Sequence, residues 1–212
     1  MKACLPDEQQ PLFAKMVRST VQIESRDMEK IGAGVLISPT GLILTADHVV
    51  GDVNRFDIRP CRLEKWRIKL LKRMFDVEVV YRDERADIAV LLIKEGLQGA
   101  VHAEIDYGPT KAGAGVYRVG TDRIPMASGH VYTFWNDMSV RHLAISMTAE
   151  NGCSGGPIFN DDLKLVGIAV RATDDLKLPT TCYAVQTRTI HSRILFRRVV
   201  KQHLPEDLRK PR

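Results

Sequence analysis

Short β-rich runs recur along most of the 212-residue chain, separated by turn signals at intervals of about 8–12 residues. This spacing is typical of a β-sandwich or barrel, and one such unit often reaches about 200–250 residues. The sequence therefore predicts a single all-β domain over residues 1–212. The expected strands span residues 20–23, 33–38, 42–45, 75–81, 88–93, 115–119, 129–134, 142–147, 157–159, 165–171 and 182–185.

The two ends of the chain and one internal stretch have a different pattern. A lead-in segment over residues 1–18 contains a short helical pattern before the first strand. Residues 187–204, TRTIHSRILFRRVVKQHL, carry apolar side chains at a spacing that predicts a C-terminal helix. The basic stretch 62–73, RLEKWRIKLLKR, also has apolar residues at helical spacing, although strands precede and follow it.

Composition argues against several classes of protein. No run of about 18 apolar residues is present, as a membrane-spanning helix requires. The first residues, MKACLPDEQQPLF, lack the apolar region of a secretory signal, so we expect a cytoplasmic location. The four cysteines show no CxxC spacing, which argues against a zinc site and predicts free thiols in a reducing compartment. We expect no metal and no cofactor.

Three polar residues at strand edges form a chemically coherent set. They are His48 in LTADHVV, Asp87 in RADIAVLL and Ser154 in NGCSGGP. A serine hydroxyl is a poor nucleophile unless a base takes its proton, and a histidine serves as that base when a carboxylate holds its tautomer. The order His, Asp, Ser along the chain differs from the order of the same three residue types in α/β-hydrolases and in subtilisin.

The sequence segments around these residues resemble the trypsin-like serine proteases, and within them the HtrA/Deg branch. The resemblance rests on GAGVLISPTGLILTADHVV, RADIAVLLIK and NGCSGGPIFN, continues in KAGAGVYRVGTDRIP, SGHVY and CYAVQTRTI, and covers about residues 13–190. It implies two perpendicular six-stranded β-barrels with the active site between them, and a polypeptide substrate. The implied segments are a first barrel over 19–100, a second over 110–186, a C-terminal helix over 187–204 and a basic tail over 205–212.

The same resemblance assigns roles to the serine loop. Ser154 matches the nucleophile, and the backbone N–H groups of Gly152 and Ser154 match the donors that stabilise the oxyanion. A loop that turns two amides inward favours glycine, which accounts for Gly152, Gly155 and Gly156. Cys153 occupies the position before the nucleophile, where it cannot form the ion pair that activates digestive zymogens.

A substrate-binding region is implied as well. The pocket floor would come from Thr148, Ala149, Glu150 and Asn151, and its walls from Thr181 and the strand end at Arg171, Ala172 and Thr173. The main chain of 171–173 would pair with an extended substrate as an added strand. Since the floor carries no acidic residue where a trypsin-like pocket has one, and Ala149 lies at its base, we expect a small or aliphatic side chain before the scissile bond.

Alternative functions stay open at this level. The chain is compatible with a processing protease that acts on one partner only, or with a regulatory binding module built on the protease fold. The residues after Gln186 carry eight Lys or Arg against two Asp or Glu, a net charge of +6, whereas the whole chain carries +5. The basic C-terminal tail is therefore one candidate contact for nucleic acid or an anionic surface, although such runs are usually solvated. Few residues follow CYAVQTRTI, so we expect no PDZ domain in this sequence, and the oligomeric state is undetermined.

Overall fold

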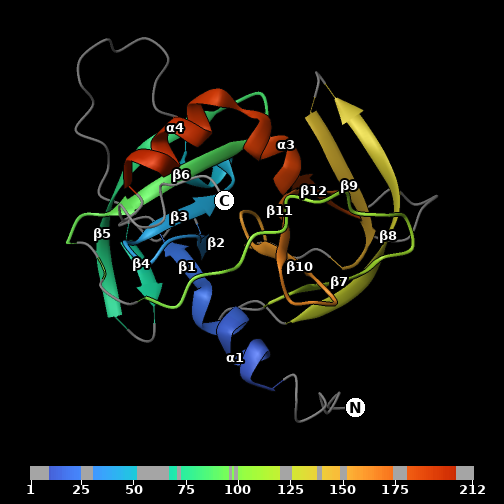
Figure 1. The fold of residues 1–212 in the computed structure, drawn as a ribbon, viewed down its shortest axis with the longest axis horizontal. Helices are drawn as coiled ribbons and strands as arrows, with labels where there is room; N and C mark the ends of the chain where they lie inside the picture. Colours follow the sequence, from blue (N-terminus) through green and yellow to red (C-terminus); the bar gives the residue numbers. More distant parts are fainter. Residues whose placement is uncertain are drawn as a thin grey trace.

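Two closed, six-stranded antiparallel β-barrels make up the body of the molecule (Figure 1). The computed structural model describes residues 10–24, 31–51, 67–70, 73–95, 97, 100–119, 126–137, 140–148, 152–173 and 181–203. The all-β, double-barrel fold expected from the sequence is therefore confirmed.

The first barrel has the strand order β1-β2-β3-β6-β5-β4 and is closed by pairing of β4 with β1. All four residues of β3 are buried, so both of its faces are covered. The strands are β1 (Thr20–Glu24), β2 (Ile31–Leu36), β3 (Leu42–Thr45), β4 (Arg67–Leu70), β5 (Arg73–Asp83) and β6 (Ile88–Ile93).

The second barrel has the order β10-β11-β12-β9-β8-β7 and is closed by pairing of β7 with β10. Its longest strand, β8, forms a hairpin with β9 that extends beyond the barrel wall on one side (Figure 1). The strands are β7 (Gly115–Arg118), β8 (Ala127–Asp137), β9 (Val140–Ser146), β10 (Pro157–Asn160), β11 (Leu165–Thr173) and β12 (Thr181–Gln186).

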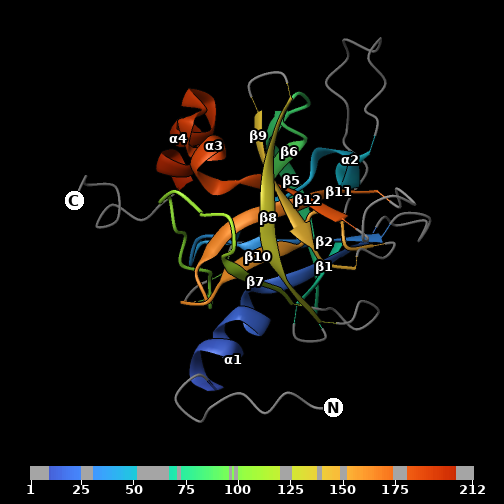
Figure 2. The same cartoon turned by 90° about the vertical axis from the view of Figure 1, so that its right-hand side faces the viewer.

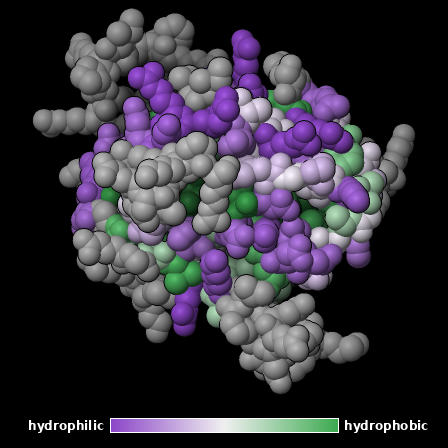
Figure 3. All heavy atoms as spheres, viewed as in Figure 1, coloured by the Kyte–Doolittle hydropathy of each residue, from purple (hydrophilic) through white to green (hydrophobic). Residues whose placement is uncertain are grey.

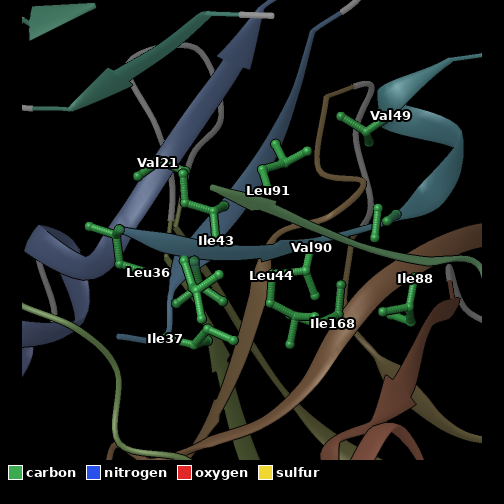
Figure 4. Close-up of a cluster of buried hydrophobic side chains, with 14 of the residues drawn as sticks. Val21, Leu36, Ile37, Ile43, Leu44, Val49, Ile88, Val90, Leu91 and Ile168 are labelled. Atoms are coloured by element: carbon green, nitrogen blue, oxygen red, sulfur yellow. The ribbon is translucent and has the colours of Figure 1, made fainter. Parts of the chain in front are cut away.

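One hydrophobic core joins the two barrels. Phe159, Ile168 and Val185 of the second barrel belong to the same buried cluster as the interior of the first. Figure 4 shows Ile168 beside Leu44 and Val90, which come from two paired strands of the first barrel. Full burial of each such aliphatic side chain stabilises the fold by about 1.5–3 kcal/mol. The relative position of the barrels, on which any site between them depends, therefore rests on shared packing.

Helices flank the barrels at opposite ends (Figures 1 and 2). Helix α1 (Gln10–Ser19) leads directly into β1, and the hydroxyls of Ser19 and Thr20 both donate to the Met16 carbonyl at 2.9 Å. Short side chains that bond the backbone in this way favour helix ends. The other helices are α2 (Asp47–Val50), α3 (Thr187–Ser192) and α4 (Ile194–His203).

The continuous helix expected over residues 187–204 is two helices. The chain leaves the helical conformation at Arg193, whose φ of −73° and ψ of 117° are extended. The guanidinium of Arg193 lies 3.3 Å from the Asp83 carboxylate, and Phe196 packs edge-on against Tyr81 with ring centroids 6.0 Å apart. Both contacts are made to β5, so docking on the first barrel accounts for the change of direction.

The helical spacing in the basic stretch 62–73 also does not produce a helix in the part described. Residues Arg67–Leu70 form β4, because this segment pairs with both β1 and β5 and closes the barrel. Residues 62–66 and 71–72 of the stretch lie outside the described residues, as does the basic tail over 205–212.

The surface is mixed in polarity. On the face seen in Figure 3, hydrophilic side chains predominate and small hydrophobic areas are scattered among them, as is ordinary for folded proteins. Within the described part of the chain, no helix has the length and apolar character needed to span a bilayer.

The buried core predicts a large penalty for truncation at Ile43. This side chain is fully buried in β3 and packs against Gly34 of the neighbouring strand. Ile43→Ala is expected to lower the free energy of unfolding by about 2–5 kcal/mol, because it removes buried methyl groups and leaves a cavity. Val17→Ala, at an exposed position of α1, serves as the control and should change it by less than about 0.5 kcal/mol. Urea unfolding measures both, and equal effects would contradict the assigned core.

Candidate active site

His48 lies in the first turn after β3. Ala46 precedes the four-residue helix α2 as its N-cap, and the neighbours Asp47, Val49 and Val50 are buried. This alternation leaves the His48 side chain pointing outward, with 48% of its surface exposed. The buried residues thus anchor the turn while the imidazole faces solvent.

Asp87 lies at the end of the turn that connects β5 to β6. Its φ of 52° is in the left-handed region, which aspartate tolerates better than most side chains. The turn is held by Ala86, whose N–H donates to Asp83 Oδ1 at 3.0 Å. This unusual backbone conformation places the Asp87 carboxylate beside α2.

The Asp87 carboxylate binds His48 through both of its oxygens. Oδ2 lies 2.8 Å from Nδ1 of the His48 ring, and Oδ1 accepts a hydrogen bond of 2.9 Å from the His48 backbone N–H. A carboxylate at Nδ1 favours the tautomer with the proton on that nitrogen. The other ring nitrogen, Nε2, is then left as a proton acceptor.

A second carboxylate, that of Asp47 in the same short helix, is bound by an arginine of the first barrel. Arg82 of β5 donates from Nη2 to Asp47 Oδ2 at 2.9 Å and from Nε to Asp47 Oδ1 at 2.5 Å. Its Nη2 also donates to the carbonyl of Gly51 at 3.1 Å. Since Asp47 begins α2 and Gly51 follows its end, one guanidinium fixes both ends of the turn that carries His48. This contact was not predicted from the sequence.

The loop carrying Ser154 is hydrogen-bonded to both barrels. The Ser154 carbonyl accepts from the Ala33 N–H of β2 at 2.8 Å, and the Gly155 N–H donates to the Ala169 carbonyl of β11 at 2.7 Å. Gly155 has a φ of 81°, and a Cβ there would lie 2.2 Å from both the Ala33 carbonyl oxygen and Thr45 Oγ1. The loop therefore contacts β3 just before α2, so the segments that carry His48, Asp87 and Ser154 meet at the junction of the barrels.

Of the two residues expected to donate to an oxyanion, Gly152 has a φ of 91° and lies in the turn that precedes Ser154.

Cys153 is buried, as is Cys182 on β12, and neither forms a disulfide. Burial raises the pKa of Cys182 to about 11, so this thiol stays protonated at neutral pH. Cys4 and Cys61 lie outside the described residues.

A cleft of about 640 Å³ extends from His48 and Asp87 across to the second barrel. Of the expected substrate-binding residues, Arg171 lines it, and Ala172 is exposed next to Arg171 on β11. Several residues that contribute to the lining were not predicted as part of the site, and three of them are aromatic or imidazole side chains of the second barrel. They are Trp135 and His142, from the β8–β9 hairpin, and Tyr183 of β12.

The other expected substrate-binding residues are in different surroundings. Thr148 is exposed, whereas Thr181 is buried and its hydroxyl lies 3.0 Å from the Tyr132 hydroxyl. Thr173 pairs with Thr181 in the β11–β12 register. Ala149, Glu150 and Asn151 lie outside the described residues.

Aromatic side chains shape the second-barrel wall of the cleft. The Trp135 ring contacts the His142 ring at a centroid distance of 5.1 Å and the Tyr183 ring at 5.6 Å, and the Arg171 guanidinium lies 6.0 Å from the Trp135 ring centre. Burial lowers the pKa of His142 below its ordinary value. His142 is therefore a neutral packing residue at pH 7. In the described part of the chain, no group of three or more His, Cys, Asp or Glu residues is arranged to hold a metal ion.

Comparison with known proteins identifies the class. The family model described as the trypsin-like peptidase domain matches residues 32–168, which is more than half of the chain. The chain therefore belongs to the trypsin-like peptidase family, and this membership implies a polypeptide substrate.

Its relatives by sequence are of the HtrA/Deg kind. The chain is 30% identical over 152 residues to a protein named "Probable periplasmic serine endoprotease DegP-like" from Pseudomonas putida (strain GB-1), which covers 68% of this chain and 29% of the relative. A protein of the same name from Rickettsia prowazekii (strain Madrid E) is 26% identical over 150 residues, covering 65% and 27%. The chain thus spans less than a third of the length of these relatives.

The fold also matches solved structures. The inactive form of the Rv3671c protease superimposes with a TM-score of 0.69 at 20% identity, covering 89% of this chain and 95% of that chain. The Ser343Ala mutant of Rv3671c from M. tuberculosis H37Rv, also in an inactive form, gives the same TM-score and covers 92% of its own chain. At this level of identity the likeness supports the fold alone.

The comparison corrects one expectation. The sequence relatives are named periplasmic endoproteases, which contradicts the cytoplasmic location predicted from the first residues of the chain. That prediction was wrong because it relied only on the composition of the first thirteen residues.

The Arg82–Asp47 pair is expected to stabilise the turn that carries His48. In a double-mutant cycle with Arg82→Gln and Asp47→Asn, we expect a coupling free energy of about 0.5–3 kcal/mol in urea unfolding, because the two largely buried side chains form paired, charge-assisted hydrogen bonds. Arg198→Gln, at an exposed position of α4, is the control for loss of one surface arginine. Additive effects of the two changes would contradict the coupling.

The lowered pKa of His142 predicts a pH-dependent stability. Between its lowered pKa and the ordinary value of about 6.5, the unfolded chain binds more protons than the folded one, so stability is present above pH 6.5 and is lost as the pH falls. The wild type is expected to lose more unfolding free energy between pH 7 and pH 5 than His142→Gln does. Identical losses in urea titrations at the two pH values would contradict this.

Proposed function

We propose that residues 1–212 act as one serine endopeptidase domain in which His48, Asp87 and Ser154 form the catalytic triad. The observation that carries the proposal is the two-point contact of Asp87 with His48, at 2.8 Å and 2.9 Å, in a family whose members use this order of residues. The attachment of the Ser154 loop to both barrels supports it, because that loop abuts the segment that ends at His48.

The chemistry follows from these positions. Ser154 Oγ attacks the scissile carbonyl while Nε2 of His48 takes its proton, and the negative charge that develops on the carbonyl oxygen is stabilised by the N–H groups of Gly152 and Ser154. His48 then gives the proton to the leaving amine, which produces an acyl-enzyme. Water, deprotonated by His48, attacks the ester and releases Ser154. Asp87 holds the Nδ1–H and stabilises the imidazolium formed in each half-reaction.

We infer that the substrate binds as an extended strand along the end of β11. Arg171 and Ala172 are exposed at this edge, and Arg171 lines the cleft that reaches His48. Thr173, Thr148 and Thr181 complete the proposed binding region on the second barrel. The preference for a small or aliphatic side chain rested on Ala149, and it stays a prediction because Ala149 and Asn151 lie outside the described residues.

We also propose that the domain works in the periplasm or cell envelope, as the names of its relatives indicate for those proteins. The mechanism uses only side chains and backbone amides of this chain, so it requires no metal and no organic cofactor. Because His48 must be neutral to accept a proton from Ser154, protonation of its imidazole is expected to abolish activity.

The proposal predicts covalent labelling of a single serine. Wild-type protein is expected to react with a fluorophosphonate probe, and Ser154→Ala to lose the label while retaining its fold by circular dichroism. Peptide hydrolysis should fall by about four to six orders of magnitude in Ser154→Ala and in His48→Ala, because the nucleophile and base act as a unit.

Ser128→Ala, at an exposed position of β8, is the matched control and should keep both label and activity. Absence of label on the folded wild type would contradict the proposal and favour a binding module. Label combined with cleavage of one partner protein, but of no unrelated peptide, would favour a dedicated processing protease.

A further inference from the structure

A buried arginine lies beside the proposed active site and was not predicted as part of it. Arg118 is the last residue of β7, and only 1% of its surface is exposed. It follows Val116 at the inward-facing positions of this strand, and Val116 belongs to the hydrophobic core of the second barrel. A charged residue in a register that otherwise points into a core is the sequence signal that could have identified it.

The guanidinium of Arg118 is only partly satisfied. Its Nη1 donates to the Thr148 carbonyl at 2.8 Å, whereas Nε and Nη2 are buried and have no hydrogen-bond partner among the described residues. An arginine is always charged, and a buried charge without acceptors is strongly unfavourable. Two converging donors of one guanidinium therefore lack an acceptor.

These atoms lie close to the serine loop. Thr148 begins the segment that leads to Ser154, and Arg118 Cδ is 3.9 Å from the position that a Cβ would take on Gly156. The Arg118 charge also acts on Cys182, where it opposes the rise of the thiol pKa caused by burial. The guanidinium thus contacts Thr148, which belongs to the proposed floor of the substrate pocket, and its charge acts on Cys182, which follows Thr181 of the proposed wall.

Arg82 of the first barrel shows the kind of acceptor that fits these two donors. Arg82 uses the same two atoms, Nε and Nη2, to bind both oxygens of Asp47. A carboxylate matches this edge of a guanidinium in charge and geometry, because two parallel hydrogen bonds form at once. By contrast, an aliphatic side chain in the pocket would leave both donors of Arg118 without a partner.

We propose that Arg118 is a specificity-determining residue that selects an acidic side chain, Asp or Glu, immediately before the scissile bond. This inference rests on the proposed function and names the substrate class of the same site. It differs from the small or aliphatic preference expected from Ala149, and one set of measurements distinguishes the two.

The test uses full-length protein and quenched peptides that are identical except at the residue before the scissile bond, which is Glu, Gln, Asp, Asn, Ala or Val. We expect kcat/KM for each acid to exceed that of its amide by about 10- to 100-fold, as for a buried charge-assisted hydrogen bond. In Arg118→Gln this acid-to-amide ratio should fall to about one. Arg118→Lys, which keeps the charge but loses the paired donors, should give an intermediate ratio.

A second arginine supplies the matched control. Arg171 is exposed at the proposed substrate strand and lines the cleft, so Arg171→Gln removes one positive charge near the substrate without changing the buried Arg118. The acid-to-amide ratio is expected to survive in this variant, and a ratio that depends on Arg171 instead of Arg118 would overturn the inference. If a preference for acidic over amide substrates appears only in Glu150→Gln, Glu150 is the partner of Arg118 in the wild type. That result would also overturn the inference.

Different results would contradict the specificity inference and the proposed function. If the wild type is labelled by the fluorophosphonate probe but cleaves best after Ala or Val, with an acid-to-amide ratio near one, the specificity inference is wrong and the proposed function stands. If the folded wild type is neither labelled nor able to cleave any peptide, the proposed function itself is wrong. The wild-type ratio decides between these outcomes even if an Arg118 variant fails to fold.

Discussion

The attachment of the serine loop to both barrels is the constraint on which the rest of the site depends. The Ser154 carbonyl is bound to β2 and the Gly155 amide to β11, so the loop bridges the two halves of the fold. Gly155 leaves no space for a side chain, since a Cβ there would overlap Ala33 and Thr45. This close approach sets the position of the loop relative to β3, and therefore relative to His48 three residues beyond Thr45.

On the first barrel, two carboxylate contacts fix the histidine turn. Asp87 binds the His48 ring and backbone, while Asp47 is held by Arg82, which also reaches Gly51. A four-residue helix has little stability of its own, because helix nucleation is unfavourable. Its geometry therefore comes from these ion pairs and from burial of Val49 and Val50. In the second barrel Arg118 presents the same two guanidinium donors, Nε and Nη2, but no carboxylate of the described residues binds them.

Much of the fold could be predicted from local pattern, whereas several parts of the site could not. The hairpin around Pro39–Gly41, the strand Ile88–Ile93 and the loop around Ser154 are marked by turn residues, apolar runs and glycines. Residues 187–204 have one helical pattern, yet the helix breaks at Arg193 where α4 docks on β5. Trp135 contacts His142 and Tyr183 on the second-barrel wall of the cleft only because β8, β9 and β12 are neighbours in the barrel.

The sequence by itself determined the all-β class, the order of most strands, and the residues whose chemistry suits a serine peptidase, because strand periodicity, turn residues and short motifs are local properties. Only the tertiary structure decided which side chains share the cleft, that Arg82 binds both ends of the histidine turn, and that Arg118 is buried with two donors that have no acceptor in the described part of the chain. These features depend on contacts between segments far apart in the chain. Burial and hydrogen-bond satisfaction are properties of the packed molecule, and no single segment of sequence carries them.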